Sequence, residues 1–506
     1  MPEVKVYRSG ALIARSESAP GVTILKHLSD AGIFLDAPCG GRGRCGKCLV
    51  RLSPDGAETR ACQTSITGDM DVYIPGEMEM EIAGDDAAAK GATVAADEPL
   101  GVAVDIGTTT VVAHLTSLRT GIRAATASGV NAQRPYGADV ISRIQYCASN
   151  GHEQLTALIR GQLRDLITRA CADAGADPRG IEYISIAGNT IMEHLAAGLS
   201  PVGMGVAPFR PLSLFGDETP VWDDLGVAHG ATVYFAPAIS SYVGGDITAG
   251  MLSAGLEDTE GPCVYIDIGT NGEIAMKLGE RYLCCATAAG PAFEGAEISM
   301  GMAAVPGAVN HVVWEDGAVK YTTIGGAPAE GLCGSGLLDA LALLVRQGAV
   351  DETGRLLPRE ETSGAISEYL ESRDGKNIFR LARGCKVYMD YADVRKLQLA
   401  KSAIAAGIQT LLTHAGIDEG GVRAFVLAGG FGSFMDKDSA AAIGLFPKIF
   451  LPATRAVGNT AGEGAALALR SAEARATLGA MRERCEYIEL STSSVFNEQF
   501  VEQMMF

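Results

Sequence analysis

The chain has 506 residues, of which 47% are hydrophobic and 63 are glycine, and its formal net charge is −19. This length corresponds to about three domains of roughly 150 residues each, and the glycine content favours α/β units separated by turns. The negative charge argues against nucleic acid as the main partner, because neutralising phosphates requires a basic surface. No uninterrupted apolar run approaches the roughly 18 residues of a membrane span, and the N-terminus lacks a signal-peptide pattern, so we expect a cytoplasmic protein that does not bind membranes.

Four of the twelve cysteines lie close together near the N-terminus, at Cys39, Cys45, Cys48 and Cys62. Four thiolates with the spacing C-x5-C-x2-C-x13-C fit either a tetrahedral zinc ion or a 2Fe–2S cluster. Zinc sites usually contain two short cysteine pairs, whereas only one such pair is present here. Glycines between the first two cysteines suit a loop wrapped closely around a cluster, so the pattern favours 2Fe–2S.

The segment around these cysteines has the pattern of a small β-rich domain. Residues 3–15 alternate apolar and polar side chains, which predicts a β-hairpin, and Thr23 is expected to cap a short helix. Together with the cysteines, residues 1–84 resemble the plant-type ferredoxin domain, a β-grasp fold. Residues 85–98 are small and polar, and we expect a linker that lets this domain move relative to the rest of the chain.

One short motif occurs twice. A hydrophobic β-run leads into Asp105-Ile106-Gly107-Thr108, and the same four residues recur at 267–270. Glycines at a strand end bring backbone N–H groups close to a phosphate, and a neighbouring carboxylate can hold the accompanying Mg²⁺. The repeat therefore predicts two copies of one unit that face a single nucleotide. The residues expected to surround its phosphates are Asp105, Gly107, Thr108, Thr109, Asp267, Gly269, Thr270, Asn271, Gly272 and Glu273.

Further glycine-rich turns follow predicted strands or open predicted helices. Gly334 and Ser335 open one helix, and the loop Gly429-Gly430-Phe431 follows a predicted strand. A long helix is expected from Val394 to about Thr413, with Gln398 and Lys401 near one face at helical spacing. We expect that face either to contact the adenine or ribose of a nucleotide or to be solvated helix surface.

The ordered set of loops resembles the acetate and sugar kinase, heat-shock chaperone and actin superfamily over residues 100–470. This resemblance implies two RNase-H-like α/β halves, residues 99–258 and 259–506, that clamp ATP. It implies that Asp105 and Asp267 belong to the two phosphate loops and that Gly429, Gly430 and Phe431 belong to the adenosine loop. The chain as a whole is then α/β and α+β, with a β-grasp domain joined to an ATP clamp.

The complete arrangement resembles the reductive activators of corrinoid proteins, including the cysteine loop and the later segment 289–295. This resemblance implies a 2Fe–2S cluster, ATP and Mg²⁺ as cofactors, with a low-potential electron donor and a corrinoid protein of a methyltransferase system as partners. It implies the ATP-dependent return of cob(II)alamin to cob(I)alamin. Whether the chain forms a homodimer is left open.

Three other functions remain open at this stage. The first is an activator of another low-potential enzyme, such as a radical dehydratase. Such activators have a similar ATP clamp but typically bridge two subunits with a 4Fe–4S cluster, and this chain has no further cysteine pair that is suitable for one. A small-molecule kinase with a fused redox domain would need a substrate pocket that the sequence does not locate. A non-enzymatic regulatory scaffold is disfavoured by the intact phosphate loops.

Overall fold

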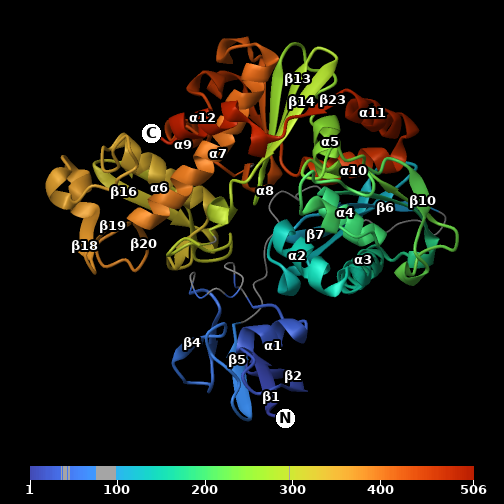
Figure 1. The fold of residues 1–506 in the computed structure, drawn as a ribbon, viewed down its shortest axis with the longest axis horizontal. Helices are drawn as coiled ribbons and strands as arrows, with labels where there is room; N and C mark the ends of the chain where they lie inside the picture. The colour runs from blue at the N-terminus through green and yellow to red at the C-terminus, as the bar shows by residue number, and fades with distance from the viewer. Residues whose placement is uncertain are drawn as a thin grey trace.

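The computed structural model describes residues 1–35, 37, 41, 43, 46–75, 98–295, 297–432 and 434–506. Figure 1 shows a small N-terminal unit, residues 1–75, below a larger unit, residues 98–506. We call these two units the head and the body. Among the described residues, no helix is both long and apolar enough to cross a membrane.

The head is a five-stranded sheet with one helix packed on it. The strand order is β2-β1-β5-β3-β4, with β1 antiparallel to β2 and parallel to β5. This is the arrangement expected for a β-grasp fold, and the predicted hairpin and the Thr23 helix cap are both confirmed. The elements are β1 (Glu3–Arg8), β2 (Ala11–Glu17), α1 (Ile24–Asp30), β3 (Leu49–Arg51), β4 (Glu58–Arg60) and β5 (Met70–Ile74).

The body contains two six-stranded sheets with the same topology at their centres. In each, three consecutive strands form an antiparallel meander whose first strand pairs in parallel with a later strand, β6 with β9 and β12 with β21. The two copies of one structural unit that the repeat predicted are therefore confirmed. The first sheet, ordered β10-β11-β9-β6-β7-β8, comprises β6 (Leu100–Ile106), β7 (Thr110–Ser117), β8 (Arg123–Val130), β9 (Ile181–Gly188), β10 (Glu218–Pro220) and β11 (Thr232–Phe235). The second, ordered β22-β21-β12-β13-β14-β23, comprises β12 (Cys263–Ile268), β13 (Gly272–Leu278), β14 (Arg281–Thr287), β21 (Ala424–Ala428), β22 (Thr454–Ala456) and β23 (Cys485–Tyr487).

Helices cover the sheets, and two small sheets are inserted in the second half (Figure 1). The helices are α2 (Val140–Asn150), α3 (Glu153–Ala174), α4 (Thr190–Ala197), α5 (Gly245–Ser253), α6 (Gly334–Arg346), α7 (Tyr391–Ala415), α8 (Gly429–Gly432), α9 (Lys437–Ala442), α10 (Thr460–Arg470), α11 (Ala472–Glu483) and α12 (Ser494–Glu502). The inserted sheets are β15 (Ala308–Glu315), β16 (Ala318–Thr323) and β17 (Gly331–Leu332), and β18 (Leu370–Arg373), β19 (Lys376–Arg380) and β20 (Tyr388–Asp390).

Two helices are exchanged between the halves. Helix α5 follows the first sheet in sequence but packs its Ile247 and Met251 into a core with Tyr265 of the second sheet. Helix α10 comes late in the chain and packs its Ala461 and Ala465 onto the first sheet. The halves are therefore joined by two crossing helices that lie between their sheets.

The crossing of α5 and α10 depends on glycine. A Cβ on Gly464 would lie 2.1 Å from the Ala249 carbonyl oxygen, and one on Gly250 would lie 2.1 Å from the Tyr265 hydroxyl. Tyr265 in turn lies 2.8 Å from the Thr460 hydroxyl, with which it shares a hydrogen bond. At Gly464 the two helix backbones are thus too close for any larger side chain. At Gly250 a larger side chain would collide with the Tyr265 hydroxyl.

We predict that Gly464→Ala lowers the free energy of unfolding by about 2 kcal/mol, because the added methyl group forces the two backbones apart. Gly479→Ala is the matched control, since Gly479 is also in a helix but has open space around its missing Cβ. That control should stabilise the protein by roughly 0.5–1 kcal/mol. Urea unfolding of the two variants measures both effects, and equal stability of the Gly464 variant and the parent would contradict the prediction.

Candidate functional site

The two repeated aspartates lie at equivalent positions in the two sheets. Asp105 is next to last in β6 and pairs with Ala187 of β9, while Asp267 is next to last in β12 and pairs with Ala428 of β21. Glu273 is the direct cross-strand neighbour of Asp267. Both aspartates therefore lie at strand ends that lead into the predicted phosphate loops.

The carboxyl groups of this region shift each other's pKa. Burial raises the pKa of Asp105 to about 6, although the Asn459 amide, which donates to Asp105 at 2.8 Å, acts in the opposite direction. Burial and then Asp105 raise the pKa of Asp267 to about 7. The pKa of Glu273 is raised well above its ordinary value by burial, and then by Asp246 and Asp267. The mutual effects place these groups in one site.

Asp246 is a member of this site that the sequence analysis missed. It lies in the first turn of α5, and burial, followed by Asp267 and Asp105, raises its pKa to about 8. Wholly buried Glu193 lies close to it, and a Cβ on Gly245 would meet a Glu193 carboxylate oxygen at 2.3 Å. The Gly-Gly-Asp sequence at the start of a helix was the available signal. We call Asp105, Asp246, Asp267 and Glu273 the carboxylate site.

The carboxylate site fits Mg²⁺ accompanied by a nucleotide. Crowded carboxyl groups with raised pKa values are stabilised by a cation, and carboxylate oxygen is the ligand that Mg²⁺ prefers. Within the described ranges, no three acidic, histidine or cysteine side chains converge as a ready metal cage. That is consistent with Mg²⁺, which is usually held by one or two carboxylates together with waters and substrate phosphates.

Buried polar side chains donate hydrogen bonds to the carbonyls of the first predicted phosphate loop, residues 107–109. Asn131 donates its side-chain amide to the Gly107 carbonyl at 2.8 Å. The guanidinium of Arg143, which is completely buried, donates to the Thr108 carbonyl at 2.5 Å. A Cβ on Gly107 would lie 2.8 Å from the Thr110 carbonyl oxygen, so the turn requires glycine. These contacts occupy the loop carbonyls.

The second phosphate loop, residues 269–272, is a tight turn. The Gly269 amide donates to the Asn271 carbonyl at 2.9 Å, and the Thr270 hydroxyl donates to Glu294 at 2.7 Å. A Cβ on Gly272 would lie 2.8 Å from the Thr287 hydroxyl. The loop is therefore compact and is linked through Thr270 to the segment 289–295.

The predicted adenosine loop lies beside the second phosphate loop. Gly429 has φ +84°, and a Cβ there would lie 2.4 Å from an Asp267 carboxylate oxygen. The Phe431 ring stacks on Phe293 with centroids 5.2 Å apart. A Cβ on Gly334 would lie 2.0 Å from the Phe293 carbonyl oxygen, so the start of α6 packs against the same segment. Gly430 follows Gly429 in the predicted adenosine loop. In the first turn of α6, next to Gly334, the Ser335 hydroxyl donates to the Asn310 carbonyl at 2.8 Å.

Gln398 and Lys401 do not face the nucleotide loops. The Gln398 amide donates to the Met504 carbonyl and the Lys401 ammonium to the Met505 carbonyl, each at 2.5 Å. The Lys401 ammonium also lies 4.9 Å from the centre of the Phe506 ring. Both side chains are 1% exposed. The expectation of an adenine contact is therefore wrong, and we assign them to anchoring the C-terminal segment on α7.

In the head, two of the four predicted cluster ligands are described. Cys48 is buried, its pKa is raised by that burial, and the adjoining Cys62 side chain raises it further. Cys39 and Cys45 lie outside the described residues. Gly41, Gly43 and Gly46 all have positive φ values between 70° and 81°, a conformation that favours glycine. Two adjoining thiols under a glycine loop fit a metal centre with thiolate ligands.

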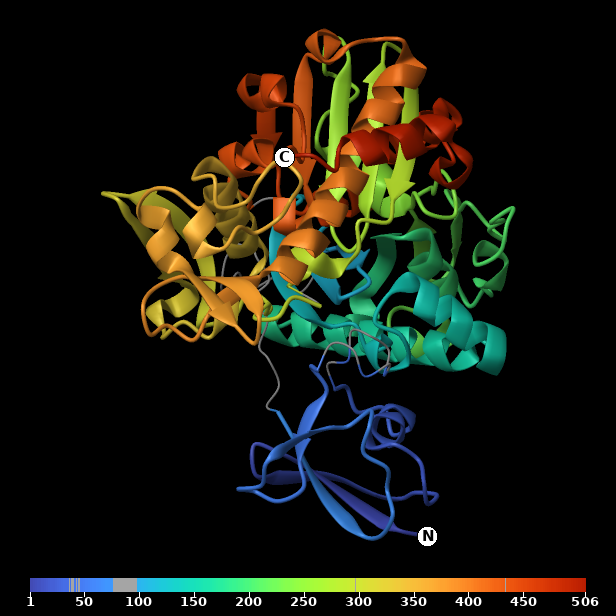
Figure 2. The same ribbon diagram turned by 60° about the vertical axis from the view of Figure 1, so that its left-hand side comes forward.

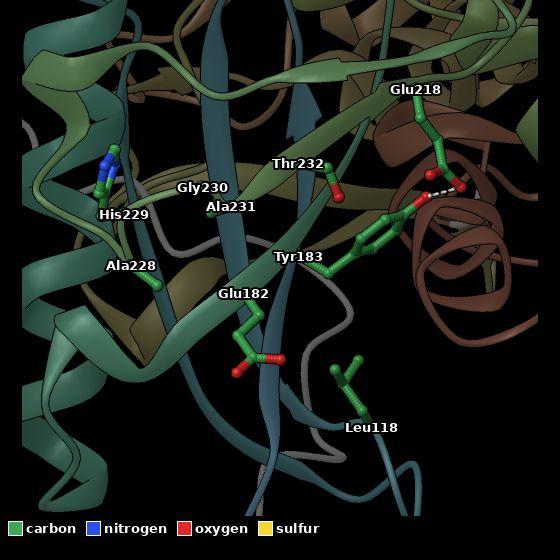
Figure 3. A pocket seen from close by; sticks show the side chains of 9 residues that line it. All are labelled: Leu118, Glu182, Tyr183, Glu218, Ala228, His229, Gly230, Ala231 and Thr232. Atoms are coloured by element: carbon green, nitrogen blue, oxygen red, sulfur yellow. Dashed lines mark hydrogen bonds between the residues drawn. The ribbon is translucent and has the colours of Figure 1, made fainter.

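A separate surface hollow of about 520 Å³ lies at the edge of the first sheet (Figure 3). Tyr183, which lines it, donates its hydroxyl to Glu218 at 2.6 Å. Tyr183 is near the beginning of β9, whereas Ala187, which pairs with Asp105, is near the end of that strand. The hollow is therefore at the opposite end of the sheet from the carboxylate site.

Two matching halves with paired phosphate loops define an ATPase clamp of the acetate and sugar kinase, heat-shock and actin class. Comparisons with known proteins identify its family. A family model described as the C-terminal domain of RACo, the ASKHA domain, matches residues 261–506, and one described as the RACo middle region matches residues 100–259. The chain belongs to the RACo family.

Three relatives illustrate this membership. The corrinoid activation enzyme RamQ of Eubacterium limosum is 32% identical over 94% of each chain. A Methanosarcina barkeri protein, named as the reductase of the Co(II) methylated amine-specific corrinoid protein, is 24% identical over 69% of this chain and 66% of its own. The solved structure of a reductive activator for corrinoid, iron-sulfur protein superposes with a TM-score of 0.71 and 28% identity, covering 100% of this chain and 98% of that one.

We predict that the nucleotide-free protein loses thermal stability as the pH rises from about 4 to about 8, that is, from the ordinary aspartate pKa of 3.8 to the raised pKa of Asp246. Between the ordinary aspartate value of 3.8 and the raised value, the folded protein keeps protons that the unfolded chain has released. Raising the pH through this window therefore favours unfolding, and the loss levels off above the raised pKa.

Thermal unfolding across this pH range measures the effect, with Asp246→Asn as the diagnostic variant. Its midpoint should fall less with pH than that of the parent, because one of the raised groups no longer titrates. A parent midpoint that rises over this interval, or an unchanged slope in the variant, would contradict the prediction.

Proposed function

We propose that the chain is an ATP-dependent reductive activator of a corrinoid protein. It passes one electron from a 2Fe–2S cluster in the head to cob(II)alamin and regenerates cob(I)alamin for methyl transfer. The observation that carries this proposal is the presence, in one chain, of two adjoining thiols in the head, buried Cys48 and half-buried Cys62, and of the carboxylate site beside the two predicted phosphate loops in the body. The names of the relatives RamQ and the Methanosarcina barkeri reductase support the same acceptor.

ATP is needed because the electron transfer to cob(II)alamin is energetically uphill. A downhill transfer needs no nucleotide, whereas each 59 mV of uphill one-electron transfer costs about 1.4 kcal/mol. A bound nucleotide changes an equilibrium only through unequal affinity for the states it connects. The ATP-bound body must therefore hold the corrinoid protein in a different way from the nucleotide-free body.

We assign the body residues the following roles. Asp105 and Asp267 would hold Mg²⁺ directly or through water, and the loops at Gly107–Thr109 and Gly269–Gly272 would direct backbone N–H groups to the phosphates. Asp246, in the first turn of α5 and beside both aspartates, would accept a proton from the attacking water. Glu273, beside Asp267, orders that water or the Mg²⁺ shell.

In the head, Cys39, Cys45, Cys48 and Cys62 would hold the cluster, which supplies a single electron when bound. The burial of Cys48 keeps that centre out of water. The electron donor is a low-potential reductant, and the identity of the methyl donor follows from whichever corrinoid protein is the partner.

We predict that Asp246→Asn lowers the rate of ATP hydrolysis by about 100-fold or more, because it removes the proton acceptor. Asp173→Asn, on the exposed face of α3, is the matched control and should hydrolyse ATP like the parent. Phosphate release measures the rate, and binding of a non-hydrolysable analogue shows that the site is intact. If the Asp246→Asn variant hydrolysed ATP at the rate of the parent, Asp246 would not be the proton acceptor.

We predict that the Co(I) absorption of a corrinoid methyl-carrier protein grows only when MgATP, a low-potential reductant and this chain are all present. Cys48→Ser should abolish the signal, whereas Cys385→Ser, a half-buried cysteine of the body, should preserve it. No Co(I) with any carrier protein, despite an intact cluster spectrum and ATP hydrolysis, would overturn the proposal. Transfer of the γ-phosphate to an added metabolite would indicate a kinase instead.

A further inference from the structure

Figure 2 shows the head directly below the body. The head contacts the first half of the body through α1 and the residues after it. The Ser29 hydroxyl donates to the Pro135 carbonyl at 2.5 Å. The Arg134 guanidinium lies 4.3 Å from the centre of the Phe34 ring. Arg134 and Pro135 belong to a single 3₁₀ turn, η1 (Arg134–Tyr136), which forms the docking surface.

The head also contacts the second half of the body. Lys47, two residues after Cys45 and next to Cys48, donates to the Gly301 carbonyl at 2.7 Å. Gly301 lies just after Ser299, whose amide donates to Asp393 in the first turn of α7 at 2.8 Å. Among the described residues, the head therefore contacts both halves of the clamp, at η1 in the first half and at Gly301 in the second.

The docking surface shares buried side chains with the first phosphate loop. The Asn131 side chain, which donates to the Gly107 carbonyl, also accepts through its Oδ1 from the backbone N–H of Gln133 at 2.9 Å. Arg143 donates to the Gln133 side chain at 3.0 Å and to the Thr108 carbonyl at 2.5 Å. Buried Asn131 and Arg143 therefore connect the carbonyls of the first predicted phosphate loop to Gln133, immediately before η1.

The docking surface also faces the second phosphate loop. The protein around Glu294 raises the pKa of that carboxyl, and the Arg134 guanidinium acts in the opposite direction, so the two charges interact. Glu294 is the acceptor of the Thr270 hydroxyl. The Arg134 guanidinium therefore contacts the Phe34 ring of the head and interacts electrostatically with a carboxyl group that accepts from Thr270 of the second predicted phosphate loop.

We propose that η1 is a nucleotide-sensitive docking site for the head. Without nucleotide the head is held on η1, and MgATP between the phosphate loops releases it, so that the head reaches the partner protein only in the ATP-bound state. This inference deepens the proposed function and rests on its nucleotide site. It assigns to Ser29, Phe34 and Arg134 a role in regulation.

Two physical effects favour release over tighter docking. The nucleotide brings several negative charges toward Arg134, and a guanidinium binds phosphate more strongly than it binds an aromatic face. In addition, the two contacts of the head lie on different halves, so both are kept at only one relative position of the halves. Closure around a nucleotide changes that position.

Hydrogen–deuterium exchange on the full, cluster-loaded chain tests the proposal. With Mg²⁺ and a non-hydrolysable ATP analogue, the amides of α1 and η1 should exchange about tenfold faster than without nucleotide. Phe34→Ala and Ser29→Ala should each give faster exchange in both segments before nucleotide is added. Phe34→Tyr, which keeps an aromatic face, should behave like the parent.

Leu12→Ala is the matched control, because Leu12 is an apolar side chain of the head that is 50% exposed on β2. It should leave exchange at α1 and η1 unchanged. Analogue binding is measured by calorimetry on the same samples. Bound analogue with unchanged or slower exchange in both segments would overturn the docking inference and leave the proposed function standing. Absence of analogue binding would overturn both.

Discussion

The repulsion among the four acidic side chains of the carboxylate site is the constraint on which the rest of the body depends. Asp105 and Asp267 come from different sheets, yet each affects the ionisation of Asp246. Bringing such groups together out of water is unfavourable unless a cation or a proton compensates. The fold must therefore hold the two halves together by other contacts when no cation occupies the carboxylate site.

The exchanged helices supply those contacts. Apolar side chains of α5 pack into the core of the second sheet and those of α10 onto the first, and glycines bring the two backbones into direct contact. Asn459, which caps α10, also donates to Asp105, so the same helix that joins the halves positions one of the carboxylates. Stability and active-site geometry consequently rest on the same pair of helices.

The parts of the site that sequence predicted are those encoded locally. Asp105 and Asp267 are found from a four-residue repeat because a strand, its last carboxylate and the following glycine turn are adjacent in the chain. Asp246 has no such repeat, since its role arises only when α5 crosses to the other half. Gln398 and Lys401 share a helix face, as expected, but periodicity does not indicate that the C-terminal residues 503–506 cover that face. The small sheets β15–β17 and β18–β20 went unpredicted, partly because strands such as Gly331–Leu332 and Tyr388–Asp390 are too short to establish an alternating pattern.

Coupling between two sites is reciprocal, which constrains how the head and the nucleotide act on each other. If nucleotide weakens the docking of the head on η1, docking must weaken nucleotide binding by the same factor. The docked head then discourages nucleotide binding, while the departure of the head favours it. Because Arg134 contacts Phe34 on one side and interacts with Glu294 on the other, a single guanidinium is placed to carry this exchange. On this proposal, the head and the nucleotide site influence each other through the surroundings of one guanidinium.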